Sequence, residues 1–349
     1  MNMFKVTSGA TPVSDVRQAA EALLELIKVS RQFGEQPDTV GRLLAHAGLA
    51  KLPPIVKAVD TVDLTVRKGE VVGLVGESGC GKSTLGRIVA GILQPSSGSV
   101  HWRGRDSQTL PAAQRKEAKL QVQMVFQNPF ASLNPRMTVG EIVGEAPTVH
   151  GLVKGDRESY IDEQMQRAGL DPALKGRYPH QFSGGQRQRI GIARALAVNP
   201  EFLVCDEAVA ALDVSIQAQI LNLFLDLREK LGLTYLFISH DLGVVEHLSD
   251  RVAVMYLGRI IEDAPTQEVF ARPNHPYTIA LLEEVPRIDT RKREFPFLKG
   301  ELPSPLSPPS GCHFHPRCPH AMARCKVEAP ALKTIAPGHR SACHLNDVT

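Results

Sequence analysis

Residues 71–89 read VVGLVGESGCGKSTLGRIV, and this stretch decides the fold of the chain. Val71–Val75 is an almost continuous apolar run, as expected of a strand that is covered on both faces. An amphipathic helix is predicted next, from an apolar stripe at Leu85, Ile88, Val89 and Ile92. Between strand and helix, residues 76–83 fit the phosphate-binding pattern G-x-x-x-x-G-K-S/T. The stretch therefore predicts an α/β fold with a phosphate-binding loop.

The residue types of this loop suit ATP and Mg²⁺. Its glycines let backbone N–H groups and the following helix N-terminus point at an anion. Lys82 supplies a positive charge to the β- and γ-phosphates, and Ser83 supplies a hydroxyl ligand for Mg²⁺. The predicted nucleotide-binding residues of the loop are Gly76, Glu77, Ser78, Gly79, Cys80, Gly81, Lys82, Ser83 and Thr84.

Two further strands end in polar side chains. Residues 202–205 predict a buried strand that ends in Asp206 and Glu207. Asp206 can hold the Mg²⁺ shell, and Glu207 can polarise a water molecule for attack on the γ-phosphate. Residues 233–238 predict another buried strand, and His240 follows it. With a helix at 216–231 and a hairpin at 251–261, the pattern is α/β with a largely parallel sheet, which binds ligands at the carboxyl ends of its strands.

A second helix start carries a distinctive sequence. Residues 183–189 read SGGQRQR, in which Ser183 and Gln186 have the spacing of a capping box. Gly184 and Gly185 leave the N-terminus of this helix bare. Taken alone, the segment is compatible with an ordinary capped helix end.

Composition limits the class of protein. The chain has 349 residues, enough for roughly two domains at about 150 residues each, and 43% of them are hydrophobic. With 40 basic and 37 acidic residues the net charge is +3, which argues against a surface that coats nucleic acid. No apolar run approaches the roughly 18 residues of a membrane span, and no secretory signal is visible. We expect a soluble, cytosolic protein of two parts.

Together the motifs resemble those of ABC-type ATPases. The chain carries, in that family's order, the phosphate loop, Gln127 in VFQNP, the 183–186 signature, Asp206 and Glu207, Asp213 in AALD and His240 in ISHD. The resemblance covers about residues 23–265. It implies a P-loop ATPase fold with a mostly parallel sheet, a helical subdomain at about 128–195 and a dimer of ATPase subunits.

The resemblance also implies a role for each motif. Glu207, His240 and Gln127 are the expected catalytic residues, and Ser83, Gln127 and Asp206 the expected Mg²⁺ ligands. The nucleotide-binding set then extends to Ser183, Gly184, Gly185, Gln186 and Asp213, the last at the dimer seam. Phe33, which follows the strand-like residues 23–29, would stack on adenine.

The chain departs from the family pattern beside Glu207. Ala208 stands where Pro is usual, and Ala210 stands where Ser is common. Both residues are small, so we expect the turn to survive. The hydrogen bond that the serine normally makes across the dimer seam is not available to Ala210.

The last 60 residues differ in composition from the rest. Residues 290–349 contain nine of the 25 prolines and five of the 12 histidines, and LPSPLSPPS at 302–310 excludes a continuous helix or central strand. We expect an N-terminal extension at 1–22, an ATPase domain at 23–287, and a Pro-rich linker with a C-terminal cysteine-rich module at 288–349. Residues 34–54 are a second candidate excursion, loop-like at both ends with a short helix between.

Four cysteines of this module predict a metal centre. Cys312, Cys318, Cys325 and Cys343 are spaced C-x₅-C-x₆-C-x₁₇-C, with gaps wider than the about two to four residues usual for zinc. Four thiolates without a C-x-x-C pair fit an iron–sulfur cluster at least as well as zinc, and the family resemblance implies a 4Fe–4S cluster. A zinc site and free structural thiols are the alternatives.

Finer motifs narrow the resemblance to one branch of the family. FQNPFASLNP at 126–135, HPY at 275–277 and the cysteine-rich tail are similar to ATPase subunits of dipeptide and oligopeptide importers. Such a subunit would act at the cytoplasmic face of the membrane. Its partners would be a second ATPase subunit, identical or related, two permease subunits and, indirectly, an extracytoplasmic binding protein. Import of nickel, glutathione or another small solute is an alternative, as is a soluble ABC ATPase that acts on nucleic acid or ribosomes.

Overall fold

The computed structural model describes residues 21–34, 55–283 and 302–347. The strands are β1 (Ala22–Phe33), β2 (Val56–Arg67), β3 (Val71–Val75), β4 (Ser97–Trp102), β5 (Arg105–Asp106), β6 (Val122–Val125), β7 (Phe202–Asp206), β8 (Thr234–Ile238), β9 (Arg251–Tyr256), β10 (Arg259–Pro265), β11 (Lys333–Ala336) and β12 (His339–Ser341). The α-helices are α3 (Lys82–Val89), α4 (Ala112–Gln121), α5 (Pro129–Ser132), α6 (Val139–Val149), α7 (Arg157–Arg167), α8 (Gly184–Leu196), α9 (Val214–Leu231), α10 (Leu242–Leu248), α11 (Thr266–Ala271), α12 (Pro276–Glu283) and α13 (Ala323–Val327). Short 3₁₀ turns are η1 (Pro172–Leu174), η2 (Pro179–Gln181) and η3 (His344–Asp347).

The main sheet has eight strands in the order β11-β12-β10-β9-β3-β8-β7-β6. Five consecutive strands of this sheet pair in parallel, in the order β9-β3-β8-β7-β6. Every residue of β3, β7 and β8 is buried, which explains their continuous apolar sequences. The predicted hairpin at 251–261 is confirmed as β9 and β10, which pair antiparallel around Gly258.

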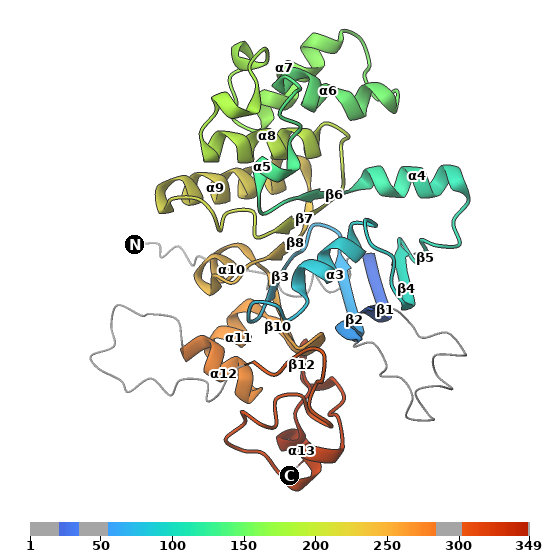
Figure 1. Ribbon diagram of the computed structural model, residues 1–349, viewed down its shortest axis with the longest axis vertical. Helices are drawn as coiled ribbons and strands as arrows, with labels where there is room; N and C mark the ends of the chain where they lie inside the picture. Colours follow the sequence, from blue (N-terminus) through green and yellow to red (C-terminus); the bar gives the residue numbers. More distant parts are fainter. Residues whose placement is uncertain (1–20, 35–54, 284–301, 348–349) are drawn as a thin grey trace, which may run out of the picture.

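A second, antiparallel sheet covers helix α3. Its strand order is β2-β1-β4-β5, and the sequence analysis predicted only the part of β1 at residues 23–29. Apolar side chains of this sheet, such as Leu24 and Leu64, share one core with Leu85 of α3 and Val204 of β7. Helix α3, which follows the phosphate loop, therefore packs against strands of both sheets. Figure 1 shows it beside β1 and β2.

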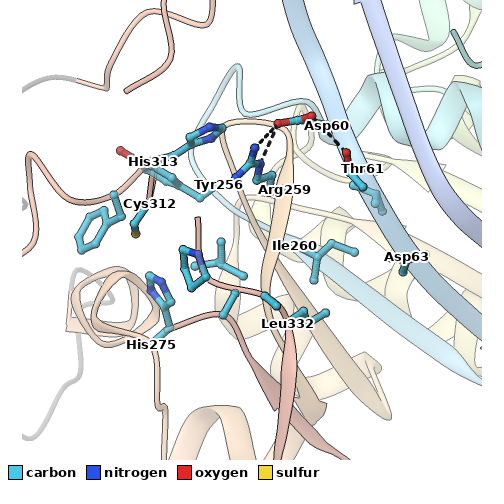
Figure 2. A pocket seen from close by; sticks show the side chains of 16 residues that line it. Asp60, Thr61, Asp63, Tyr256, Arg259, Ile260, His275, Cys312, His313 and Leu332 are labelled. Carbon is cyan, nitrogen blue, oxygen red and sulfur yellow. Dashed lines mark hydrogen bonds and ion pairs between the residues drawn. The ribbon is translucent and has the colours of Figure 1, made fainter. Parts of the chain in front are cut away.

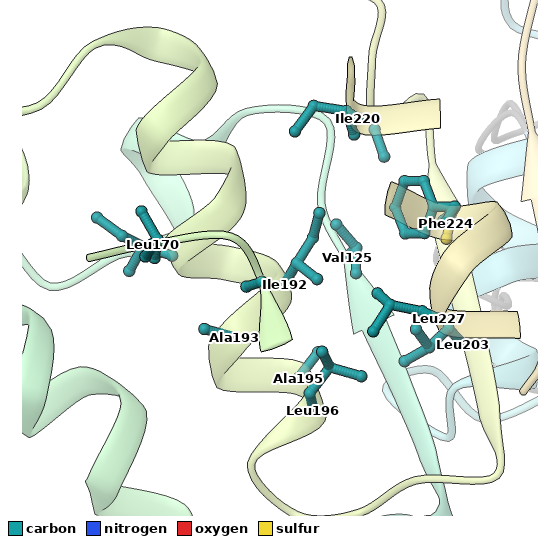
Figure 3. Close-up of a cluster of buried hydrophobic side chains, with 14 of the residues drawn as sticks. Val125, Leu170, Ile192, Ala193, Ala195, Leu196, Leu203, Ile220, Phe224 and Leu227 are labelled. Carbon is teal, nitrogen blue, oxygen red and sulfur yellow. The ribbon is translucent and has the colours of Figure 1, made fainter. Parts of the chain in front are cut away.

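The helices between β6 and β7 gather at one end of the molecule. Helices α5, α6, α7 and α8 form this part, and the long helix α9 lies beside it (Figure 1). Figure 3 shows the core that joins it to the sheet, where Ile192 of α8 faces Val125 of β6 and Phe224 of α9 lies nearby. This packing fixes the start of α8 relative to the sheet.

The C-terminal segment lies at the opposite end and extends the main sheet (Figure 1). Strand β12 pairs with β10 through Glu262–Ser341 and Asp263–Arg340, and β11 adds outside it. The Pro-rich residues 302–310 contain neither helix nor strand, as predicted. The tail thus shares its sheet with the ATPase core, a connection that the sequence analysis did not anticipate.

Some predictions differ from the structure or fall outside it. Helix α3 ends at Val89, because Gly91 adopts a left-handed φ of 66°, so the predicted stripe residue Ile92 lies beyond the helix and is 56% exposed. Residues 1–20, 35–54 and 284–301 are outside the described residues, and with them most of the N-terminal extension, the second excursion and the first part of the linker. Across the described ranges, no helix is both long and apolar enough to cross a membrane.

Candidate nucleotide site

The predicted site residues follow the carboxyl ends of four strands that lie side by side. In the order β3-β8-β7-β6, these ends carry Gly76, His240, Asp206 with Glu207, and Gln127. Parallel strands bring their carboxyl ends to one edge of the sheet, where α/β proteins bind ligands. The structure therefore brings together residues that are more than 100 positions apart in the sequence.

The phosphate loop needs glycine at both of its bends. Gly76 has a φ of 149° and Gly81 a φ of 111°, conformations that favour glycine. A Cβ atom at Gly76 would lie 2.2 Å from the carbonyl oxygen of Met255, and one at Gly81 would lie 2.0 Å from that of Ala58. Close backbone approach on both sides thus shapes the loop before any ligand binds.

Lys82 is the first residue of α3 and is buried against this loop. Only 5% of the residue is exposed, and its Nζ donates hydrogen bonds to the carbonyl oxygens of Gly76 (2.7 Å) and Glu77 (3.0 Å). These bonds hold the ammonium group at the start of the loop. Cys80, another of the predicted nucleotide-binding residues, is buried beside it.

A hydroxyl and a carboxylate meet at the next turn. Ser83 Oγ donates a 2.8 Å hydrogen bond to Asp206 Oδ1. Burial raises the pKa of Asp206, and the adjacent Glu207 carboxylate raises it further. These hard oxygen donors fit Mg²⁺, whose charge would stabilise the buried carboxylate.

Glu207 lies between an amide and an imidazole. Gln127 Nε2 donates a 2.6 Å hydrogen bond to Glu207 Oε2, and His240 Nδ1 lies 3.5 Å from Glu207 Oε1. The backbone of Glu207 has a φ of 47°, and its N–H donates to the Ile238 carbonyl (2.9 Å). A non-glycine residue in the left-handed region marks a position where the surrounding structure imposes the conformation.

The predicted capping box at the start of α8 is confirmed. Ser183 Oγ accepts a hydrogen bond from the Gln186 N–H (3.3 Å), and Gln186 Oε1 accepts one from the Ser183 N–H (3.0 Å). Both residues are exposed, as is Asp213 at the start of α9. Within the described ranges, no hydrogen bond or ion pair joins this helix start to the phosphate loop of the same chain.

Phe33 ends β1 close to the phosphate loop. It pairs with Val56 of β2, two residues before Ala58, whose carbonyl oxygen abuts Gly81. The Phe33 ring is 39% exposed, and the Arg31 guanidinium lies 4.8 Å from its centroid. Adenine stacking by Phe33 stays a prediction.

Two contacts to the loop have no signal in the local sequence. The Glu77 N–H donates a 2.9 Å hydrogen bond to the hydroxyl of Tyr277, and Arg317 Nη1 lies 2.8 Å from Glu77 Oε1. These partners are 200 and 240 residues away, so no local pattern could indicate them. The HPY motif marked Tyr277 as characteristic of a family branch, without a structural role.

The four tail cysteines line one very small cavity. Its volume is about 10 Å³, hardly room for a water molecule. Burial raises the pKa of Cys312 to about 11, and the other three thiols contribute in the same direction. No group of three or more His, Cys, Asp or Glu side chains within the described ranges is arranged to hold a metal ion. The described arrangement of these thiols is therefore not that of a formed metal site, and the 4Fe–4S cluster and its zinc alternative stay predictions.

A larger cavity of about 430 Å³ lies between β2, β10 and the tail. Figure 2 shows Tyr256, His275 and Cys312 on its wall, with Arg259 paired to Asp60 at its rim. None of the predicted nucleotide-binding residues lines it. It marks the junction between the tail and the ATPase core.

A strand, phosphate loop and helix, with a carboxylate pair at the end of the next strand but one in the sheet, define a P-loop ATPase. The family described as ABC transporter matches residues 59–210, and the oligopeptide/dipeptide transporter C-terminal region matches residues 261–325. The oligopeptide transport ATP-binding protein AppF of Bacillus subtilis is 54% identical over 330 residues, covering 93% of this chain and 98% of that protein. The chain belongs to the ABC transporter family and is one of its ATP-hydrolysing members.

Solved structures agree with this assignment. The dimeric ATP-binding cassette MJ0796 bound to ADP and phosphate is 27% identical, with a TM-score of 0.58, and the match covers 70% of this chain and 98% of that one. The CbiO1 protein of Clostridium perfringens, part of an ABC transporter complex, is 26% identical with the same TM-score, and the match covers 72% and 92% of the two chains.

Proposed function

We propose that the chain is the energy-coupling ATPase subunit of an importer for dipeptides or oligopeptides. The match of residues 261–325 to the oligopeptide/dipeptide C-terminal region carries this proposal, because it lies outside the segment that all ABC transporters share. The 54% identity to an oligopeptide transport protein across nearly its whole length supports it.

The chain would work with partners at the cytoplasmic face of the membrane. We propose a second ATPase subunit, two permease subunits and an extracytoplasmic binding protein that selects the solute. The exposed start of α8 and the exposed Asp213 support a second ATPase subunit, because the described contacts leave them unconnected to the chain's own phosphate loop. In the dimer, Ser183, Gly184, Gly185 and Gln186 would face the γ-phosphate of the opposing subunit, where their N–H groups and the helix dipole stabilise negative charge.

Within one subunit, Glu207 would accept the proton of the attacking water. Gln127 contacts one oxygen of the Glu207 carboxylate and His240 lies beside the other, so the two residues would orient the base and the water. Lys82 would exchange its loop carbonyls for phosphate oxygens. Ser83, Asp206 and Gln127 would hold Mg²⁺, which supplies charge neutralisation for the phosphates.

The tail cysteines would hold a 4Fe–4S cluster in the assembled protein. Four thiols around one cavity support this proposal, whereas their present arrangement does not suit a metal ion. Loading would therefore require the cysteine-bearing segments between residues 312 and 343 to rearrange, so that cluster binding is coupled to the conformation of the tail.

Anaerobic purification followed by iron, sulfide and zinc analysis tests the cluster. We expect about four irons and four sulfides per chain, lost in Cys318→Ser and retained in Cys205→Ala, whose thiol lies in the sheet core. Stoichiometric zinc without sulfide would contradict the cluster in favour of a zinc site, and absence of any metal would leave four structural thiols.

Purification from detergent-extracted membranes tests the transport assignment. We expect a complex with two strongly hydrophobic subunits, whose ATPase activity rises when a peptide-loaded binding protein is added. Stable association with ribosomes or RNA instead would contradict the proposal.

A further inference from the structure

Arg317 brings a buried positive charge from the tail to the phosphate loop. Its side chain is 5% exposed, and Nη1 lies 2.8 Å from Oε1 of Glu77. The two residues are 240 positions apart, so the pair forms only when the tail is folded against the ATPase core. The Glu77 side chain is 23% exposed, so only the Arg317 end of the pair is buried. Removing Glu77 would leave the buried Arg317 charge uncompensated, so the pair stabilises this arrangement of tail and loop.

A cluster of three aromatic residues lies beside Arg317. The Tyr256 hydroxyl accepts a 3.4 Å hydrogen bond from Arg317 Nη1, and the ring of Phe314 contacts those of Tyr256 (5.4 Å between centroids) and Tyr277 (5.5 Å). The Tyr277 hydroxyl in turn accepts the backbone N–H of Glu77. The side chain and the backbone of Glu77 are therefore both contacted by residues that lie C-terminal to residues 59–210, the segment that matches the ABC transporter family.

Glu77 connects these contacts to Lys82 of the phosphate loop. Its carbonyl oxygen accepts a hydrogen bond from Lys82 Nζ, and it follows the tightly packed Gly76. Its carboxylate belongs to the loop that would bind the phosphates of ATP, where an unpaired negative charge disfavours the ligand. Arg317 both neutralises this carboxylate and fixes the loop segment that carries it.

We infer that Arg317 is a positioning residue for ATP binding, acting through Glu77. The folded tail thereby sets the affinity of the phosphate loop for nucleotide. This role is independent of the transported solute. It predicts a change in ATP affinity with little change in the rate at saturating ATP, because Glu207 and its partners are not touched.

Neutral variants of the full-length chain test the inference. Arg317→Gln should raise the Kd and KM for ATP about tenfold, the effect of losing one charge-assisted interaction, with kcat within about twofold. The double variant Glu77→Gln/Arg317→Gln removes the unpaired carboxylate as well as its partner, so it should bind ATP more tightly than Arg317→Gln but less tightly than wild type. Arg324→Gln is the matched control in the same tail, because Arg324 forms exposed ion pairs with Glu328 and Asp347.

Three outcomes would overturn the inference. They are wild-type ATP affinity in Arg317→Gln, equal weakening in Arg317→Gln and Arg324→Gln, or a double variant that binds no better than Arg317→Gln. Tyr277→Phe provides a test that leaves the ion pair intact, since it removes only the acceptor of the Glu77 N–H. We expect it to raise KM several-fold at unchanged kcat, and an unchanged KM would count against the inference.

Discussion

Glu207 is placed where three neighbouring strands end. Its carboxylate meets Gln127 from β6 and His240 from β8, while its backbone is anchored to Ile238 in a left-handed conformation. The backbone therefore fixes the direction of the side chain, and the two neighbours fix its oxygens. Such a group is suited to accept a proton from one defined water molecule.

Replacing this base should separate binding from hydrolysis. Glu207→Gln preserves size and hydrogen bonding but removes the negative charge, so we expect ATP to bind and trap a closed dimer while turnover falls about 10²–10⁴-fold. Phosphate release and size-exclusion chromatography with ATP measure the two effects. Glu229→Gln, at an exposed position of α9, is the control. Turnover of Glu207→Gln within a few-fold of wild type would place the base elsewhere.

Two adjacent glycines at the start of α8 are under different constraints. A Cβ atom at Gly184 would have Leu212 Cδ2 as its nearest neighbour at 3.8 Å, which is ordinary contact. At Gly185 it would lie 2.4 Å from Ile216 of α9, which would have to move. Gly184 can therefore be replaced without disturbing the packing of α8 on α9.

This difference makes Gly184 the position to probe the proposed dimer site. We expect Gly184→Asp to fold, to bind ATP as a monomer nearly as well as wild type, and to lose turnover because its carboxylate repels the opposing γ-phosphate. Gly184→Ala adds bulk without charge and should retain much more activity. Equal loss of monomer nucleotide binding in Gly184→Asp would contradict a role across the dimer interface.

Among the secondary-structure elements, Arg251 connects strands of both sheets. From the start of β9 its Nε lies 2.8 Å from Glu70 Oε1, next to β3, and its Nη1 lies 2.6 Å from Asp263 Oδ1 on β10. It also donates to the Thr65 carbonyl on β2. Arg340 of β12 bonds the other oxygen of Asp263, so the network continues into the tail.

Breaking this network should destabilise the fold strongly. Arg251→Met leaves two largely buried carboxylates without their shared partner, and we expect the free energy of unfolding to fall by about 3–5 kcal/mol. Urea denaturation measures the change. The matched variant Lys230→Met breaks an exposed pair with Asp226 and should have no measurable effect. Similar losses in both variants would show that burial of the Arg251 network is unimportant.

At the scale of the whole molecule, the sequence predicted the features that depend on neighbouring residues. The phosphate loop, the Asp206–Glu207 strand end and the Ser183–Gln186 capping box each require a fixed local spacing, and the structure shows each loop, strand end and helix start where expected. Helix α3 stopped early for a local reason, since Gly91 ends it before the stripe residue Ile92.

Long-range pairing accounts for most of what the sequence could not predict. The antiparallel sheet depends on β1 meeting β4, about 70 residues further along, and the tail joins the main sheet only through the pairing of β12 with β10. The Arg317–Glu77 pair likewise has no local signature. The four cysteines were predicted as a metal centre from their spacing, but the structure gathers them around a cavity without a metal-binding arrangement.

Peptide uptake in cells that lack this chain shows whether the ATPase powers peptide import. The measurement compares uptake of labelled di- and oligopeptides with that of nickel and glutathione, before and after the chain is returned as wild type, Glu207→Gln or Glu229→Gln. We predict that peptide uptake is lost with the chain, restored by wild type and Glu229→Gln, and not restored by Glu207→Gln. Peptide uptake that persists without the chain, while nickel or glutathione uptake is lost, would contradict the account.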